Sequence, residues 1–493
     1  MNKYLQINAA DNVAVAIEPL KTGESVLLNG KSMTLKNDIP AGHKFLLNNL
    51  KAGENVIKYG YPIGHLLEDK RQGEWVNEHN LKTNLSGLLE YEYHPVEAPT
   101  PTFNSRLLTF QGYRRQNGEV GIRNELWIVP TVGCVNGICQ QLAEQFKQES
   151  QASVVAFPHN YGCSQLGDDH EQTRKILRDV VLHPNAGGVL IVSLGCENNQ
   201  PEAFEQMLGN YDHGRIRFMV TQRIEGDELE EGMQLLREIH AVMSKDERTE
   251  VPLSELRVGL KCGGSDGFSG ITANPLLGHF SDYIVSQGGT TVLTEVPEMF
   301  GAETILMNRC ANRELFHQTV NLINDFKQYF LSHGEPVGEN PSPGNKAGGI
   351  STLEEKALGC TQKCGTSLVR GVLPYGERLK AKGLNLLSAP GNDLVASTAL
   401  AASGCHIVLF TTGRGTPFGT FVPTMKISTN STLAQRKPTW IDFNAGVLLE
   451  GASWEETLQA FTNKIIAVAS GEPTWNERKH YQEIAIFKNG VTL

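Results

Sequence analysis

The residues that could do chemistry lie in short polar loops, and each of these loops follows an apolar, strand-forming run. Seven loops share this pattern: TVGCVNG, FPHNYGC, SLGCENNQ, LKCGGSDG, LTEVPEMFG, SAPGNDL and FTTGRGTP. In parallel α/β sheets, ligands bind beyond the carboxyl ends of the strands. We therefore expect the seven loops to converge on one crevice, where Cys, His, Asp, Glu and Asn side chains offer metal ligands and proton carriers.

One of these loops belongs to the stretch LRVGLKCGGSDGFSGITANP, which runs from Leu256 to Pro275. It begins as a strand and continues as a run of Gly, Ser, Asp and Asn. Glycines let other atoms approach the main chain closely, and small polar side chains add donors and acceptors without bulk. The stretch suits a small hydroxyl-rich or anionic ligand, and it also suits an ordinary tight turn.

The segment PHNYGCSQLGDDH places His159, Cys163, Asp168, Asp169 and His170 close together in the sequence. A metal or acid–base role is one interpretation of this cluster. The alternative is structural, with hydrogen-bonded histidines and two aspartates that begin the following helix. The sequence alone leaves both interpretations open.

Charged residues also follow two other strands. Glu295 and Glu298 follow the strand TTVLTEVPE, where a carboxylate can hold a divalent cation or exchange a proton. Arg414 lies in GRGTPFG and can clamp a carboxylate through two parallel hydrogen bonds, although a solvated surface arginine fits equally well. GRGTPFG lacks the full dinucleotide or P-loop signature, so we do not expect nucleotide binding.

The elements that must position these loops fall into three domains. Residues 1–95 contain short apolar runs between glycines, which predicts a small β domain, and a proline-containing linker spans residues 96–104. Strands then alternate with helices, which predicts mostly parallel sheets. A charged segment near residue 248 divides this part into domains of residues 105–248 and 249–493. We expect residues 334–353 to form a long loop without secondary structure.

Composition limits the classes of partner and compartment. The 493 residues carry a net charge of −10, and Lys and Arg are scattered, so nucleic acid is not an expected partner. No apolar run is long enough to cross a bilayer, and we see no signal peptide, so we expect a cytoplasmic protein. Nine cysteines, an odd number in a chain of this length, indicate reduced thiols rather than a disulfide framework.

The sequence resembles the altronate/galactarate dehydratase family of sugar-acid hydro-lyases in the order and length of its motifs. The resemblance covers essentially the whole chain and rests on NEHNLKTN, GIRNELWIVPTVGC, HNYGCSQLGDDH, LGCENNQ, CGGSDGFSGITANP, LTEVPEMFGAE, NPSPGNKAGGISTLEEKALGCTQK, SAPGND and TTGRGTPFGTFVPTMKI. It implies an α/β multidomain protein whose N-terminal β domain is of the SAF type, which is β-clip-like. GITANP and PEMFGAE are closer to the altronate branch of the family than to the galactarate branch.

The resemblance implies dehydration of D-altronate to 2-dehydro-3-deoxy-D-gluconate in hexuronate (galacturonate) catabolism. It also implies activation by Fe²⁺, with Mn²⁺ as a substitute. Two alternatives stay open: a galactarate or related sugar-acid dehydratase that uses an Fe–S cluster, and a sugar-acid-binding protein without turnover. We expect a sugar acid as the partner, no contact with a membrane, and a homodimer.

This chemistry agrees with the polar loops. The proton on C2 of a sugar acid, next to the carboxylate, is only weakly acidic, and a divalent cation on the carboxylate and a neighbouring hydroxyl spreads the charge that develops when a base removes it. An acid then helps the C3 hydroxyl to leave. A polyol also needs many short polar contacts, which the glycine-backed Ser, Asp and Asn side chains supply.

We assign site roles from motif position and chemistry. The predicted metal ligands are His79 with His159, or with Glu197 or Glu295, which would make the β domain a lid over the α/β crevice. The alternative sulfur set is Cys163, Cys196 and Cys360. The predicted catalytic residues are His159, His170 and Asp266. The predicted substrate contacts are Arg123, Ser265, Asp266, Asn345, Lys346, Asn392, Asp393 and Arg414.

Overall fold

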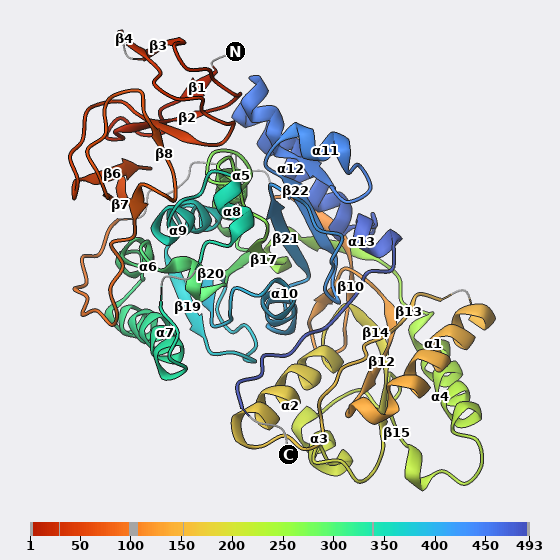
Figure 1. Cartoon of the computed structure of the whole chain (residues 1–493). Helices are drawn as coiled ribbons and strands as arrows, with labels where there is room; N and C mark the ends of the chain where they lie inside the picture. Colours follow the sequence, from red (N-terminus) through yellow and green to blue (C-terminus); the bar gives the residue numbers. More distant parts are fainter. Residues whose placement is uncertain (1–2, 29, 98–106, 151, 338–339, 491–493) are drawn as a thin grey trace.

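The computed structural model describes residues 3–28, 30–97, 107–150, 152–337 and 340–490. It has a β domain at one end, a central C-terminal domain, and a second α/β domain at the opposite end (Figure 1). The predicted class, a small N-terminal β domain followed by α/β domains with mostly parallel sheets, is confirmed. Most of the predicted linker at residues 96–104 lies outside the described residues. No described helix combines the length and apolar character that a membrane crossing requires.

The β domain consists of short antiparallel strands, as the regular spacing of its glycines predicts. One sheet contains β1 (Tyr4–Leu5), β2 (Val13–Ala16), β5 (Lys44–Leu46) and β8 (Trp75–Val76). The remaining strands are β3 (Ser25–Leu28) with β4 (Lys31–Thr34), and β6 (Asn55–Lys58) with β7 (Tyr61–Leu66) and β9 (Leu81–Lys82).

The second domain is a four-stranded parallel sheet with the strand order β13-β12-β14-β15. Its strands are β12 (Glu125–Pro130), β13 (Val154–Ala156), β14 (Ala186–Ser193) and β15 (Ile216–Val220). Its helices are α1 (Asn136–Ser150), α2 (Gly167–Val181), α3 (Pro201–Leu208) and α4 (Glu228–Met243). The charged segment at the domain boundary forms β16 (Thr249–Pro252), which pairs with β10 (Thr109–Arg114) beside β11 (Val120–Gly121).

The C-terminal domain is a seven-stranded parallel sheet with the order β19-β20-β18-β17-β21-β22-β23. Its strands are β17 (Arg257–Cys262), β18 (Thr290–Leu293), β19 (Val369–Leu373), β20 (Gly383–Leu387), β21 (Ile407–Thr412), β22 (Thr424–Ser428) and β23 (Phe443–Asn444). Its helices are α5 (Ala273–Ser286), α6 (Glu303–Asn308), α7 (Arg313–Ser332), α8 (Pro343–Ala347), α9 (Leu353–Thr361), α10 (Asp393–Ala402), α11 (Ser431–Arg436), α12 (Trp454–Ala469) and α13 (Trp475–Arg478).

The prediction that residues 334–353 lack secondary structure is wrong, because this segment contains α8. The side chain of Ser342 accepts a hydrogen bond from the backbone N–H of Asn345, and the side chain of Asn345 accepts one from the backbone N–H of Ser342. Such a reciprocal pair satisfies two donors that a helix start leaves without partners. The pair stabilises one short helix in this segment.

Two apolar clusters join the domains. Trp127 and Phe157 of the second domain pack edge-on against Phe421 of the C-terminal domain. Leu46 of the β domain shares a buried cluster with Leu358 on α9. Because burial of such side chains is a main source of stability, these contacts fix the position of each domain against the central one.

Candidate active site

The seven loops singled out in the sequence follow strands of two different sheets, so they do not share one sheet edge. Three of them follow β12, β13 and β14 of the second domain, and four follow β17, β18, β20 and β21 of the C-terminal domain. The order β20-β18-β17-β21 makes the last four loops neighbours at the carboxyl edge of one sheet.

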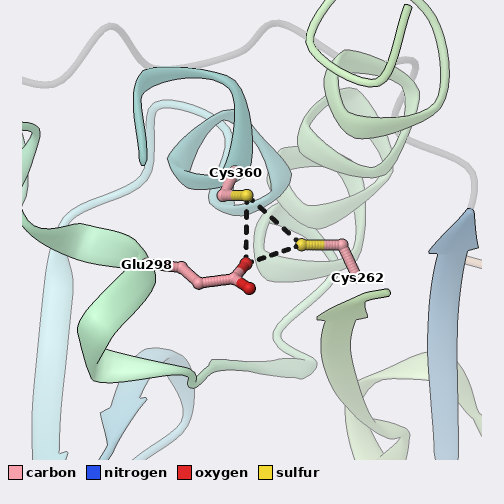
Figure 2. Close-up of side chains that lie close together, drawn as sticks. All are labelled: Cys262, Glu298 and Cys360. Atoms are coloured by element: carbon pink, nitrogen blue, oxygen red, sulfur yellow. Dashed lines mark hydrogen bonds between the residues drawn. The ribbon is translucent and has the colours of Figure 1, made fainter. Parts of the chain in front are cut away.

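Three buried side chains at this edge form a triangle, which we call the sulfur–carboxylate triad: Cys262, Glu298 and Cys360 (Figure 2). Glu298 Oε2 lies 3.0 Å from Cys262 Sγ and 3.1 Å from Cys360 Sγ, and the two sulfur atoms are 3.3 Å apart. None of the three residues is more than 4% exposed. Among the described residues, this is the one set of three such ligand atoms that lie within 4.8 Å of one another.

The triad is assembled from three elements. Cys262 is the last residue of β17, and Cys360 lies in the last turn of α9. Glu298 lies in the single turn η4 (Val296–Met299), which begins after Glu295 adopts a left-handed conformation with φ 68°. That conformation is uncommon outside glycine, and the sharp turn it makes at the end of β18 starts η4 at once. The neighbouring Gly263 has no room for a side chain, because an added Cβ would lie 2.7 Å from Asp393 Oδ1.

Two buried lysines contact the triad directly. Lys356 Nζ, on α9, lies 2.8 Å from Glu298 Oε1. Lys363 Nζ lies 2.7 Å from Cys262 Sγ and 3.2 Å from Glu295 Oε2. A buried charge destabilises the fold unless it is paired. These contacts therefore offset the cost of burying the two lysines, and they also shape the site.

A third buried lysine connects the triad to the surface. Lys261 Nζ is paired with Glu295 and lies 2.8 Å from Asp393 Oδ1. The Lys261 side chain is 0% exposed, whereas the Asp393 side chain is 36% exposed. Asp393 is therefore the carboxylate through which this buried network reaches solvent.

The pKa values follow from burial and these charges. Burial opposes ionisation of Glu298, but Lys356, Lys261 and Lys363 outweigh it and hold the pKa of Glu298 well below its usual range. Burial and the nearby Glu298 raise the pKa of Glu295. The hydrogen bond with Cys262, together with burial, raises the pKa of Cys360 well above the ordinary thiol value. Without a metal, Cys360 is therefore a protonated thiol.

The donor set fits a divalent transition metal. Thiolate ligands select iron or zinc over calcium and magnesium, which prefer all-oxygen sites. Three carboxylates (Glu295, Glu298 and Asp393) face the three lysines. A thiol must lose its proton to bind a metal, so a divalent ion bound here would displace the proton of Cys360.

The exposed rim of the edge carries residues predicted to contact substrate. Asn392 accepts hydrogen bonds from the backbone N–H groups of Leu394 and Val395, and so caps α10. Arg414 is exposed, and one guanidinium nitrogen donates a hydrogen bond of 3.2 Å to the carbonyl of Gly344. Lys346 is half-buried on the neighbouring α8. Two cationic side chains thus lie at the rim, where an anionic ligand would arrive.

Asp266, Ser265 and Asn345 tie the loops of this edge together. Asp266 accepts hydrogen bonds from the Thr429 hydroxyl and the Asn430 amide, which follow β22. The Asn345 amide donates a hydrogen bond of 2.8 Å to the Ser265 carbonyl. Burial raises the pKa of Asp266. Because its oxygens are already hydrogen-bonded within the protein, Asp266 is placed to hold the loops in position.

His159 and Glu197 lie at the edge of the second domain's sheet. His159 Nε2 lies 2.7 Å from the Pro130 carbonyl, and His159 Nδ1 accepts a hydrogen bond from the backbone N–H of Tyr161. Both ring nitrogens therefore have partners, and neither is free to ligate a metal. Glu197 is equally engaged, because its oxygens accept hydrogen bonds from the Thr131 hydroxyl and from the backbone N–H groups of residues 194 and 195.

Three other predicted site residues also lie away from the triad. The side chain of His79 is 83% exposed in the β domain, where its one charged neighbour among the described residues is Glu78. His170 lies on α2, and its buried Nε2 has no hydrogen-bond partner among the described residues. Arg123 forms an ion pair of 2.6 Å with Glu477 and joins the second domain to the C-terminal segment. The predicted ligand combinations of His79, His159, Glu197 and Glu295 are thus distributed over three domains.

The alternative sulfur set is divided in the same way. Cys360 is buried in the triad, whereas Cys163 and Cys196 are exposed on loops of the second domain. The sequence singled out Glu298 and the loop LKCGGSDG, which contains Cys262, but did not pair them with Cys360, and it did not reveal the three lysines. A clue was present in LRVGLKC, since Lys261 interrupts a strand that is otherwise apolar, and a buried lysine requires a charged partner.

Comparisons with known proteins agree with this architecture. The chain matches the altronate/galactarate dehydratase SAF domain over residues 2–84. It matches the second domain of D-galactarate dehydratase/altronate hydrolase over residues 112–244 and the C-terminal domain of D-galactarate/altronate dehydratase over residues 253–492.

Full-length relatives give the same result. The chain is 57% identical to altronate dehydratase of Bacillus subtilis (strain 168) and 55% identical to that of Escherichia coli (strain K12), with both chains covered completely in each comparison. It is 33% identical to the L-threo-forming galactarate dehydratase of Escherichia coli (strain K12) over 95% of this chain and 93% of the relative. The fold and the polar strand ends are those of a sugar-acid hydro-lyase. The chain belongs to the altronate/galactarate dehydratase family.

Proposed function

We propose that the protein is a hydro-lyase that converts D-altronate to 2-dehydro-3-deoxy-D-gluconate and water. The observation that carries the proposal is the identity of 55–57% to two altronate dehydratases over the whole length of each chain. Identity to the galactarate dehydratase is much lower, at 33%, so galactarate is the less favoured substrate.

We propose Fe²⁺ as the activating metal and the sulfur–carboxylate triad as its site. Cys262, Glu298 and Cys360 provide two sulfur donors and one oxygen donor, all buried and all within 3.3 Å of one another. Manganese, which favours oxygen ligands, would bind this set more weakly. When bound, the metal would stabilise the negative charge that develops on the substrate carboxylate as the C2 proton leaves.

The surrounding residues have roles that follow from their positions. Arg414 and Lys346 lie at the rim and would bind the substrate carboxylate, Arg414 through two parallel hydrogen bonds. Gly263 lets the Asp393 carboxylate lie close to the end of β17, because it carries no side chain. Asp393 is partly exposed and hydrogen-bonded to Lys261, so we propose it as the group that exchanges protons with the sugar acid. Asp266 holds the loops of the site.

The proposed setting is the cytoplasm, with hexuronate breakdown supplying the substrate and the protein acting as a homodimer. A chain with a net charge of −10 and an anionic substrate needs local positive charge, which Arg414, Lys346 and the buried lysines supply. Sedimentation equilibrium would measure the number of subunits independently of activity.

A substrate screen tests the proposed function. Protein purified without oxygen and supplied with Fe²⁺ and a reductant is assayed against altronate, galactarate, mannonate and gluconate for release of a 2-keto-3-deoxy acid. We expect altronate to have the highest kcat/KM of the four. A higher value for galactarate, or tight altronate binding without any keto acid, would refute the assignment.

A further inference from the structure

A second group of thiols lies at the carboxyl edge of the second domain's sheet, outside the site described above. Cys134, Cys163 and Cys196 each follow a glycine in the loop after β12, β13 or β14. We call this group the Gly-Cys edge. The strand order β13-β12-β14 makes the three loops neighbours.

Exposure separates these cysteines from the others. Cys134, Cys163 and Cys196 are the exposed ones among the nine cysteines, and the other six are buried. A free cysteine is usually a small buried apolar residue. Three exposed thiols on three adjacent loops therefore need an explanation other than packing.

The loops that carry them are locked together. The backbone N–H of Gly133 donates to the Tyr161 carbonyl at 2.9 Å, and the backbone N–H of Asn199 donates to the Gly162 carbonyl at 3.0 Å. A Cβ on Gly162 would lie 2.1 Å from the Thr131 carbonyl oxygen, so only glycine permits this approach. The loop of Cys163 is thus held against the loops of both other cysteines.

Polar groups around the Gly-Cys edge suit a negatively charged sulfur centre. The side-chain amide of Gln222 donates a hydrogen bond of 3.3 Å to Cys196 Sγ. Asn199 also ties the loops together, because its side-chain amide donates a hydrogen bond of 3.2 Å to the Thr131 carbonyl.

The spacing of the sulfur atoms distinguishes two kinds of metal centre. Ligands of a single ion crowd around one point, and the three Sγ atoms of the Gly-Cys edge are not a set within 4.8 Å among the described residues. Thiolates that hold an iron–sulfur cluster bind different iron atoms and so lie farther apart. Sulfur-only donors also select iron–sulfur clusters or zinc.

We propose that Cys134, Cys163 and Cys196 bind an iron–sulfur cluster through three thiolates, at a site separate from the sulfur–carboxylate triad. Each thiol loses its proton when it binds iron. The Gln222 amide and the adjoining backbone orient the sulfur atoms, and hydrogen bonds to sulfur are among the features that set the redox properties of such clusters.

The test uses the full-length protein, purified anaerobically and reconstituted with Fe²⁺ and sulfide. Iron and acid-labile sulfide per chain are measured after gel filtration. The triple variant Cys134→Ser, Cys163→Ser, Cys196→Ser is compared with Cys139→Ala, which removes a buried thiol from α1 in the same domain. A double variant, Cys262→Ala with Cys360→Ala, removes the triad sulfurs instead.

We expect acid-labile sulfide in the wild-type protein, in Cys139→Ala and in the triad variant. In the triple variant we expect at least a ten-fold lower sulfide content per chain, with an unchanged circular dichroism spectrum. The single variant Cys163→Ser repeats the test with a smaller change. Zinc or iron without sulfide in the wild-type protein, or equal sulfide in the triple variant, would overturn the proposal. Loss of sulfide only in the triad variant would also overturn it. None of these measurements depends on altronate turnover, so a negative result here would not count against the proposed altronate dehydratase activity.

Discussion

Lys58 of the β domain and Glu355 of α9 form a fully buried ion pair, with 2.7 Å between Lys58 Nζ and Glu355 Oε1. The other oxygen of Glu355 pairs with Lys44 at 2.8 Å. Burial opposes the charge of Glu355, but the two lysines hold its pKa at about 2. Because α9 also carries Lys356 and Cys360, this contact makes the β domain a structural support for the candidate active site.

The first prediction concerns this support. Glu355→Gln leaves the buried charges of Lys44 and Lys58 without compensation, and breaking a buried pair in this way costs about 3–5 kcal/mol. We expect the denaturant midpoint to fall accordingly and altronate turnover to be lost with it. The exposed pair of Lys3 and Glu18 provides the control, and Glu18→Gln should leave the midpoint unchanged. A Glu355→Gln midpoint equal to that of the wild type would show that the pair does not hold α9.

The second prediction concerns the close contact of Gly267 with Gly42 of the β domain. A Cβ on Gly267 would lie 1.9 Å from the Gly42 carbonyl oxygen, so Gly267→Ala must displace backbone. We expect a loss of more than about 2 kcal/mol in the free energy of unfolding, together with reduced activity. Gly137→Ala on α1 meets no atom within 4 Å and should be neutral or slightly stabilising. Equal behaviour of the two variants would mean that the β domain is docked more loosely than described.

The third prediction concerns pH and His159. Burial lowers the pKa of His159 from 6.5 to about 4. A folded-state pKa below the unfolded value means that the stabilisation is present above pH 6.5 and is lost as the pH falls towards 4. The difference corresponds to about 3 kcal/mol. Denaturant unfolding of wild type and His159→Gln at several pH values measures it.

We expect the wild type to lose stability more steeply than His159→Gln between pH 6.5 and 4. The comparison isolates His159, because the other buried histidines, His43, His183 and His406, are present in both proteins and have lowered pKa values as well. Parallel pH profiles for the two proteins would show that His159 is protonated as easily in the folded state as in the unfolded state.

The fourth prediction concerns Arg414. If its guanidinium clamps the substrate carboxylate through two parallel hydrogen bonds, Arg414→Lys should raise KM several-fold with a smaller effect on kcat, because an ammonium group cannot form the same pair of bonds. Arg436→Lys, an exposed substitution on α11, is the matched control. An unchanged KM for Arg414→Lys would place the carboxylate elsewhere.

The sequence predicted the fold class and one part of the site. Loops at strand ends can be recognised in the sequence because the apolar runs stop abruptly, and Glu295, Asp393 and Arg414 were singled out for this reason. In the structure all three lie at one sheet edge. Cys360 and Lys356 lie on α9, and Lys363 lies in the turn that follows it. Their position depends on packing against the β domain, and no local pattern encodes that packing.

Other roles could not be read from residue type. His159 resembles a ligand or a base in sequence, but the protein uses both of its ring nitrogens in hydrogen bonds to the backbone. Lys44 and Lys58 would ordinarily be assigned to the surface, because lysine is seldom buried unless it is paired. Only the folded structure shows that their partner is Glu355, about 300 residues away in the chain.

The central claim is that Cys262, Glu298 and Cys360 bind the activating metal, and X-ray absorption at the iron edge tests it most directly. The sample is the Fe²⁺-loaded triple variant that lacks Cys134, Cys163 and Cys196, so that iron at the Gly-Cys edge does not contribute. We predict about two sulfur neighbours per iron, lost in the variant that also carries Cys262→Ala and Cys360→Ala. Iron surrounded only by oxygen and nitrogen would contradict the account.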